Sequence, residues 1–359
     1  MVDFSKYNVV FCDSKEAINW AYSQGLPKDS IIKMSSPAML WDKNDSIQHI
    51  EARWTLAEMR EFQTGIKKFS EDVYDSIINV DGVTHEIALC IAHASVKFNK
   101  ILFKAACLKK EDLFEKRLFI KVEGVGGLTG NNMNSPWDDL LKNCTSYSSI
   151  SYKLKEDIWN VSSKKDIPLW NRIRLGGVEA LIYRVVDSVL AKIPRRLFSK
   201  KIIVPSENEL LIESLYYLLT KGIAVQKIKP DKNAKIEYRD FSYIRKFTSP
   251  IIKKRLQRWV VPDLVSRCLE LYFNLIYKDL RLMDKYSNQW RPVLNEIYGT
   301  KKALFINVPC NPKGLSLTEL CRKQKIPILS AQHGVSREIC SMHDAVSTIY
   351  EINAADYFF

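Results

Sequence analysis

The segment best suited to chemistry is Gln332-His333-Gly334, which directly follows an apolar run at residues 326–331. That run has the composition of a short buried strand, so the motif is expected at the strand's carboxyl end. Ligands of open α/β sheets bind there, and a histidine at that place donates to a phosphate or acts as an acid or base near neutral pH. Gly334 lets the backbone turn and bring its N–H toward an anion. A turn without a chemical role is the alternative interpretation.

A glycine-rich segment at residues 123–130 follows a strand candidate at residues 117–122. Thr129 stands where a dinucleotide-binding fingerprint needs its third glycine, and a loop-forming run follows where that fingerprint needs a helix. We therefore predict a flexible connection, with a ligand loop as the alternative.

A metal site is not predicted. His333, Cys340 and His343 would give zinc three ligands, but no fourth Cys or His lies nearby and the spacing matches no common zinc finger. The chain also lacks the motifs of phosphate-loop NTPases, zincins and α/β-hydrolases.

The elements that must position these residues begin with a β-α-β pattern. A compact apolar run at residues 8–13 predicts a strand, and a helix is expected to end at Gly25. A second strand is expected at residues 31–35, closed by Pro37. Apolar residues three and four apart then predict one or two helices over residues 48–79, followed by another at 85–108.

The middle of the chain repeats this pattern. Residues 201–205 predict a strand and residues 206–220 a helix that starts with a Ser-x-x-Glu capping box ending at Glu209. Gly222 stops that helix before a strand at residues 223–228, so the two strands are expected to be parallel.

The last part of the chain starts with helices over residues 251–298. A strand at 303–308, a helix at 316–325 and the strand at 326–331 follow, and residues 354–359 resemble the start of another strand. The chain is therefore expected to stop partway through a domain.

This recurrence predicts an α/β protein with two Rossmann-like lobes and extra helices. An N-terminal lobe is expected over residues 1–298, and an incomplete C-terminal lobe over residues 299–359. A length of 359 residues with 46% hydrophobic and 26% charged residues suits such a globular protein.

Charge and cysteine usage bear on the partners and the compartment. Lys and Arg number 54 against 41 Asp and Glu, so the surface should attract polyanions, nucleotide phosphates or an anionic membrane face. Eight scattered cysteines without framework spacing predict reduced thiols, and neither a signal peptide nor a membrane span is recognised, so we expect a cytoplasmic protein. The basic residues form two clusters, namely Lys192, Arg195, Arg196, Lys200 and Lys201, and then Arg245, Lys246, Lys253, Lys254, Arg255 and Arg258.

The sequence also resembles a known group of enzymes. A strand leading into Gln332-His333-Gly334, a loop with Arg337, and then Ala355-Asp356-Tyr357-Phe358 resemble the pattern of GT-B-type glycosyltransferases of bacterial surface polysaccharides. The similarity is greatest to surface-carbohydrate proteins associated with nonulosonic acids, and more distant to polysialyl and glycerophosphate transferases. It is strongest over residues 303–359 and loose over 1–230, where Ser35-Ser36-Pro37 before a long helix is similar to the family's opening. Val335-Ser336-Arg337 departs from the second glycine and aromatic residue that often follow His-Gly in the family.

The resemblance implies a GT-B-like fold and transfer of a sugar, with a nonulosonic acid as one option, from a nucleotide donor to a glycan or lipid-linked acceptor. The C-terminal lobe would hold the nucleotide sugar, CMP-linked donors included, and the N-terminal lobe the acceptor, with no cofactor or metal. His333 would contact the leaving phosphate or assist its departure, and Arg337 would be a second anion contact. Gln332, Gly334, Ser35 and Ser36 would contribute to substrate binding.

The catalytic base is open among Asp13, after the first strand, and Glu207 and Glu209, at the start of the middle helix. Ordinary turn and capping roles are the alternatives for all three, and Glu209 is also a substrate-binding candidate.

A different class of function competes with the enzyme. The second basic cluster, together with Trp259, is also typical of a non-catalytic module that binds nucleic acid or an anionic membrane surface. For the enzyme itself we expect no nucleic-acid partner, and the basic clusters would then dock it at the inner face of the cytoplasmic membrane.

Overall fold

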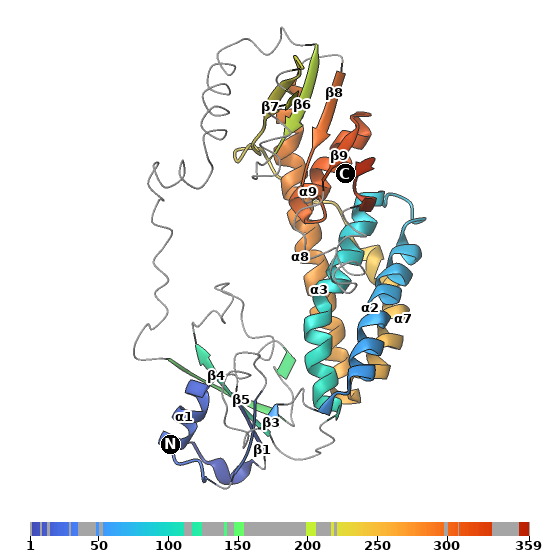
Figure 1. Cartoon of the computed structure of the whole chain (residues 1–359). Coiled ribbons are helices and arrows are strands. Elements are labelled where there is room, and N and C mark those ends of the chain that lie inside the picture. The colour runs from blue at the N-terminus through green and yellow to red at the C-terminus, as the bar shows by residue number, and fades with distance from the viewer. Residues whose placement is uncertain are drawn as a thin grey trace, which may run out of the picture. The chain divides into compact units, whose positions relative to one another are not determined.

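The structure is a computed structural model of the chain (Figure 1). It describes residues 2–7, 9–12, 15–28, 30–34, 48–49, 53–110, 117–123, 140–141, 147–153, 199–205, 217–218, 221–297, 301–307, 309–331 and 352–358.

The chain divides into two units that alternate along the sequence. Four of the five boundaries each fall inside one of four long helices, so each of these helices contributes residues to both units. Unit 1 comprises Met1–Gly65, Lys97–Ser163 and Ser249–Phe273, and unit 2 comprises Ile66–Val96, Lys164–Thr248 and Asn274–Phe359.

Unit 1 contains a parallel sheet with the strand order β3-β2-β1-β4-β5. A 3-10 turn, η1 (Phe4–Lys6), precedes the first strand, and α1 (Lys15–Ser23) connects β1 to β2. The helix ends where Gly25 adopts a φ of 94°, which confirms the predicted stop. The strands are β1 (Val9–Cys12), β2 (Ile31–Met34), β3 (Gln48–His49), β4 (Arg117–Glu123) and β5 (Tyr147–Lys153).

One prediction in this region is wrong. The helix expected from residue 48 begins only at Leu56, because Gln48–His49 form β3 and pair with β2. The start of α2 (Leu56–Ile77) is set by a capping box that the apolar spacing did not reveal. The Thr55 hydroxyl accepts from the Glu58 N–H at 3.2 Å, and the Thr55 N–H donates to the Glu58 carboxylate at 2.8 Å. Bonds from Lys110 and Thr55 lower the pKa of Glu58 to about 2.

The helical part of unit 1 is held by aromatic packing. Phe62 of α2 meets Phe103 of α3 (His85–Lys110) edge-on, with ring centroids 5.4 Å apart, and meets Trp259 of α7 (Ser242–Trp259) at 5.0 Å. Trp54 stacks on Trp259 at 5.7 Å. The predicted weak point at Gly65 does not interrupt α2. A β-carbon at this position would lie 2.7 Å from Nη1 of Arg255, so a larger residue would require the end of that flexible side chain to shift.

Unit 2 contains a second parallel sheet, with the order β10-β9-β8-β6-β7. In chain order this is 2-1-3-4-5, the order of flavodoxin-like doubly wound sheets. The strands are β6 (Lys200–Val204), β7 (Ala224–Lys227), β8 (Lys301–Phe305), β9 (Ile328–Ser330) and β10 (Tyr357–Phe358).

Both faces of the second sheet are covered, as parallel sheets require. Figure 1 shows α8 (Pro262–Asn295) and α9 (Pro312–Lys323) beside it. One face packs on these two helices through Ile203, Leu304, Ile306, Ile328, Trp290, Leu294, Leu317 and Leu320. The other carries Ile202, Val204, Val225 and Phe305 with Leu218 and Ile223 packed against them.

The predicted lobe boundary at residues 298/299 does not match this sheet. β6 pairs with β8 in the register Ile202↔Ala303, so residues 200–227 belong with the C-terminal strands. The middle and last β-α-β patterns looked like separate units in the sequence, and their parallel pairing merges them into one sheet.

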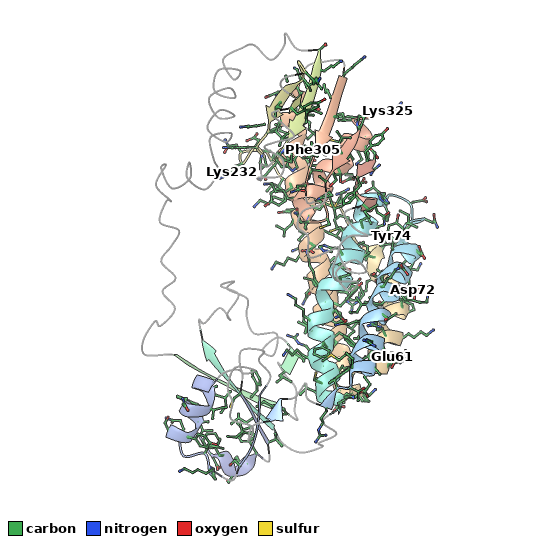
Figure 2. All side chains as sticks on the ribbon, viewed as in Figure 1. Glu61, Asp72, Tyr74, Lys232, Phe305 and Lys325 are labelled. Atoms are coloured by element: carbon green, nitrogen blue, oxygen red, sulfur yellow. The ribbon has the colours of Figure 1, made fainter. Side chains whose placement is uncertain are left out.

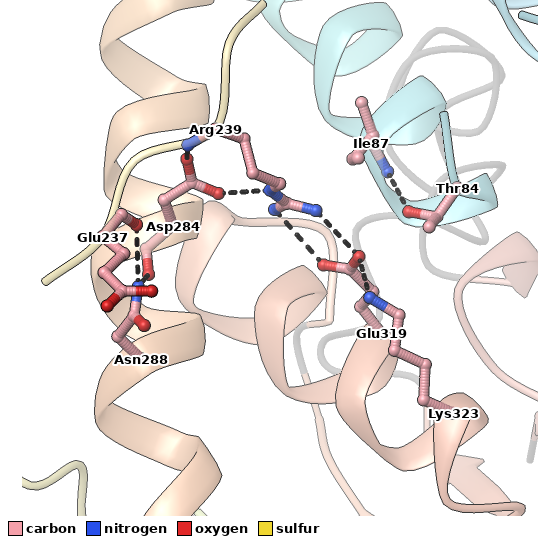
Figure 3. A network of polar contacts seen from close by, with 8 residues as sticks. All are labelled: Thr84, Ile87, Glu237, Arg239, Asp284, Asn288, Glu319 and Lys323. Carbon is pink, nitrogen blue, oxygen red and sulfur yellow. Dashed lines mark hydrogen bonds and ion pairs between the residues drawn. The ribbon is translucent and has the colours of Figure 1, made fainter. Parts of the chain in front are cut away.

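A buried ion network fixes α9 against α8 (Figure 3). Arg239 donates from Nε to Asp284 of α8 at 2.6 Å and from Nη1 and Nη2 to Glu319 of α9 at 2.9 and 3.4 Å. Its backbone N–H donates to the same aspartate at 2.8 Å. Burial alone would lower the pKa of Arg239, but the two carboxylates outweigh it and raise that pKa. Lys323 also reaches Glu319, at 2.8 Å.

A second network fixes the C-terminal segment within unit 2. Arg322 forms ion pairs of 2.6 Å with Glu86 and with Asp356, and donates to the carbonyl of Ala354. His85 lies between the hydroxyl of Tyr74 and the carbonyl of Asn353, 2.7 Å from each. His85 thus connects Tyr74 of α2 to the backbone of the C-terminal segment.

The described helices include none that combines the length and apolar character needed to cross a bilayer. Six cysteines lie in described segments, and all are buried thiols. Burial raises the pKa of Cys268 and of Cys321 to about 12, so both are protonated at neutral pH.

Replacing Arg239 by methionine should strongly destabilise the protein. Asp284 and Glu319 are only 2% and 1% exposed, and a buried carboxylate that loses its cation costs about 3–5 kcal/mol. We expect a loss of about 3 kcal/mol in the free energy of unfolding, measured by urea denaturation, because Lys323 still reaches Glu319.

Arg258→Met is the matched control. Arg258 pairs with Glu61 (labelled on α2 in Figure 2), and both side chains are mostly exposed, so its loss should cost under about 1 kcal/mol. Equal losses in the two variants would contradict a special role for Arg239.

Candidate ligand site at the carboxyl edge of the second sheet

The strand order of the second sheet marks one place for a ligand. β6 lies between β7, which follows it in the chain, and β8, so the chain direction across the sheet reverses between β6 and β8. In doubly wound sheets the connections after two such strands pass to opposite faces, which leaves a crevice outside their carboxyl ends. We call this place the carboxyl edge; its described residues are Pro205 after β6, and Ile306 and Asn307 after β8.

Asn307 is the most unusual residue at the carboxyl edge. It is only 3% exposed, yet neither polar atom of its side-chain amide has a hydrogen-bond partner in the structure as described. An unpaired buried amide costs about 1–3 kcal/mol, and such groups call for an explanation. An amide offers both donors and an acceptor, so a polar ligand with mixed hydrogen-bonding groups suits it.

The turn after Asn307 leads into α9. Asn311 caps this helix by accepting from the N–H of Gly314 at 2.8 Å, and Pro312 occupies the first turn. A β-carbon on Gly314 would lie 2.7 Å from the carbonyl oxygen of Pro309, so only glycine permits this close turn. The backbone from β8 into α9 is thereby fixed.

The amino end of α9 is electropositive. Its first turn contains no acidic residue and carries Lys313, whose Nζ lies 5.7 Å from the ring centroid of Trp290. The helix dipole adds partial positive charge at this end. Because Asn311 already binds the Gly314 N–H and Pro312 has none, an anion here would depend on the dipole and Lys313 more than on backbone donors.

β9 ends at the same edge, and the sequence motif follows it in the chain. The register Phe305↔Leu329 continues with Ile306 opposite Ser330, and Gln332-His333-Gly334 follows within two residues of that strand end. The Oγ of Ser330 is also buried without a partner in the described residues. Side chains alternate along a strand, so Ser330 belongs to the face of Ile306 and Asn307 to the opposite face.

All the site residues predicted from the sequence lie outside the described residues: Asp13, Ser35, Ser36, Glu207, Glu209, Gln332, His333, Gly334 and Arg337. The glycine-rich residues 124–130 and the zinc candidates Cys340 and His343 also lie there. No group of metal-binding side chains is found in the segments that are described. The strands that lead to Asp13 and to Gln332, β1 and β9, are confirmed.

The first sheet has a reversal of its own. Its order places β1 beside β4, with Cys12 paired to Ile120, and Asp13 follows β1 in the sequence. The sheet order therefore places the carboxyl end of β1 at a reversal point, where sheets with this strand order bind ligands.

Part of the basic cluster on α7 packs against α2. Arg255 donates to the carbonyl of Phe62 at 3.1 Å and lies over that ring, with 5.5 Å from its Cζ to the ring centroid. Burial and the neighbouring Arg258 lower its pKa to about 10. Arg258 pairs with Glu61, and Trp259 packs in the aromatic cluster described above. These three residues are therefore poorly placed to form a continuous nucleic-acid-binding surface.

Sequence reasoning missed Asn307. It was included in a predicted strand over residues 303–308, whereas β8 ends at Phe305. The available signal was a polar residue directly after a buried run and five residues before the helix-starting Pro312. This signal indicates a ligand site only when the strand order is known, and the strand order cannot be read from the sequence.

Comparisons with protein-family models, curated proteins and solved structures find no match to this chain.

Replacing Asn307 by leucine should stabilise the protein. The change removes a buried amide without partners and keeps a similar volume, so we expect the free energy of unfolding to rise by about 1 kcal/mol. Asn311→Leu is the control with the opposite sign: it removes a helix cap and should lower that free energy by about 1 kcal/mol. A loss of stability in Asn307→Leu would show that its amide is satisfied within the protein.

Proposed function

We propose that the chain is a glycosyltransferase of the GT-B type that transfers a sugar from a nucleotide donor to a glycan of a bacterial surface polysaccharide, such as a capsule or lipopolysaccharide. The observation that carries the proposal is the carboxyl edge of the second sheet, with an unpaired buried amide, an electropositive helix end and Gln332-His333-Gly334 directly after β9.

Two doubly wound parallel sheets support this assignment. The first has a Rossmann order and the second a flavodoxin-like order, and each has its own reversal point. A transferase with two substrates needs two binding places, and two such sheets offer one each. We assign the nucleotide to the second sheet and the acceptor to the first.

The proposed chemistry is a substitution at the anomeric carbon of the donor sugar. The bond from that carbon to the phosphate oxygen breaks, and a bond to the acceptor hydroxyl oxygen forms. A carboxylate, Asp13 or Glu207 with Glu209 as a further candidate, takes the hydroxyl proton. His333 and Arg337 stabilise the charge that develops on the leaving phosphate.

The remaining residues of the motif contribute to binding. The amide of Gln332 and the backbone of Gly334 contact the nucleotide, and Ser35 and Ser36 contact the acceptor. CMP-linked nonulosonic acids are the donors we would examine first.

The non-catalytic alternative has less support. It needs the basic residues of α7 as a continuous surface with Trp259, but Arg255, Arg258 and Trp259 pack against α2. Binding of DNA or anionic vesicles that falls steeply with salt, without any binding of nucleotides, would favour it.

Calorimetric titration with cytidine and uridine nucleotides tests the proposal. We expect binding at micromolar to millimolar concentration, weakened at least about tenfold by His333→Ala, since hydrogen bonds to charged groups contribute about 1.5–3 kcal/mol.

His343→Ala is the matched control, since it removes a second histidine from the same region of sequence. The proposal predicts unchanged nucleotide binding in this variant, whereas a zinc site predicts that both variants lose bound zinc. A folded wild-type chain that binds no nucleotide at millimolar concentration would overturn the proposal.

A further inference from the structure

A hollow of about 550 Å³ lies at the amino ends of the strands of the second sheet. This is the end opposite to the carboxyl edge, and a five-residue strand such as β6 separates the two by about 15 Å. The volume is typical of sites for small ligands. We call it the lysine hollow, after the residues that line it: Lys200, Lys201, Lys301, Lys302 and Lys325.

The lysines are placed side by side by the strand register. β6 and β8 pair with Lys200 opposite Lys301 and Lys201 opposite Lys302. Neighbouring strands lie about 4.8 Å apart, so each pair brings two positive side chains together at their stems. Like charges directly opposite each other destabilise a sheet, and the exposed Lys200 and Lys301 form such a pair.

Lys325 adds a fifth positive charge from the turn between α9 and β9, and Figure 2 labels it beside this sheet. Its φ is 57°, in the left-handed region where a residue with a β-carbon is disfavoured, and where glycine or asparagine usually ends a helix. Lys325 therefore adopts a backbone conformation that is energetically unfavourable for a residue with a β-carbon.

The described lining of the lysine hollow contains no acidic residue that would offset the charges of Lys200, Lys301 and Lys325. The rest of the lining is mostly apolar and includes Ile202 of β6, Ala303 of β8 and Ile326, which precedes β9. Clustered lysines repel one another and so destabilise the fold. Such an arrangement beside apolar residues is typical of a site that binds a negatively charged ligand.

We propose that the lysine hollow binds a ligand with adjacent phosphate groups, at a site separate from the carboxyl edge. Lysines bind phosphates as point charges that need no fixed direction, which suits side chains that come from two strands and a turn. Such phosphates come either from a soluble polyphosphate or from the head groups of an anionic lipid surface.

The test uses the whole chain and the variant Lys200→Gln/Lys301→Gln. Both lysines are exposed register partners, so the substitution should leave the fold intact. Without ligand, the variant should have an equal or higher melting temperature, because one pair of opposed charges is gone. One probe is sodium tripolyphosphate, followed by calorimetry and thermal denaturation, and the other is phosphatidylglycerol vesicles in phosphatidylcholine, followed by flotation.

We expect at least one probe to bind the wild type, and the variant to bind that probe about 30-fold more weakly, since a lysine near an anionic surface contributes on the order of a factor of five. Binding of tripolyphosphate identifies a soluble ligand, and binding of the vesicles alone identifies a lipid surface. Lys253→Gln/Lys254→Gln on α7 is the control, since it removes the same charge from two exposed lysines and should bind like the wild type.

The proposal is overturned if neither probe binds at millimolar phosphate, if both variants lose binding equally, or if the Lys200/Lys301 variant binds like the wild type. These outcomes are independent of the nucleotide proposal, which is tested at His333.

Discussion

The second sheet depends on one partly buried cation, the guanidinium of Arg239. Glu319 on α9 and Asp284 on α8 are almost completely enclosed, and two carboxylates in such an interior are strongly destabilising without a positive partner. Arg239 supplies it to both, and its own backbone N–H adds a further bond to Asp284. Since α9 follows β8 directly, this network also determines where the turn that contains Asn307 and Asn311 lies.

The two ends of the second sheet differ in chemistry because its strands are parallel. Every strand begins at one end, where Lys200, Lys301 and Lys325 lie, and finishes at the other, where Asn307 and Ser330 lie. In an antiparallel sheet, strand starts and strand ends alternate along each edge, so the lysines and Asn307 would not be separated in this way. Each end therefore has one destabilising feature, opposed lysines at one and an unpaired amide at the other. We propose a separate ligand for each end.

The sequence predicted much of the fold and little of its assembly. Local signals were sufficient for β1, the stop at Gly25, the helix α3 and the strand β9, because apolar runs and glycines act over a few residues. They missed β3, which has only two residues, and β5, which is polar. They also placed the lobe boundary inside the second sheet, because the pairing of β6 with β8 joins residues about 100 positions apart. For the site, the motif at His333 was visible in the sequence, whereas Asn307 and the lysine hollow required the register.

Hydrogen–deuterium exchange with and without a cytidine nucleotide tests most directly whether the carboxyl edge is the ligand site. Peptides from residues 305–315 and 328–335 should gain protection, while peptides that begin β6 and β8, at residues 199–202 and 300–303, should not change. Protection confined to the first sheet or to α7, with none at residues 305–315, would contradict the account.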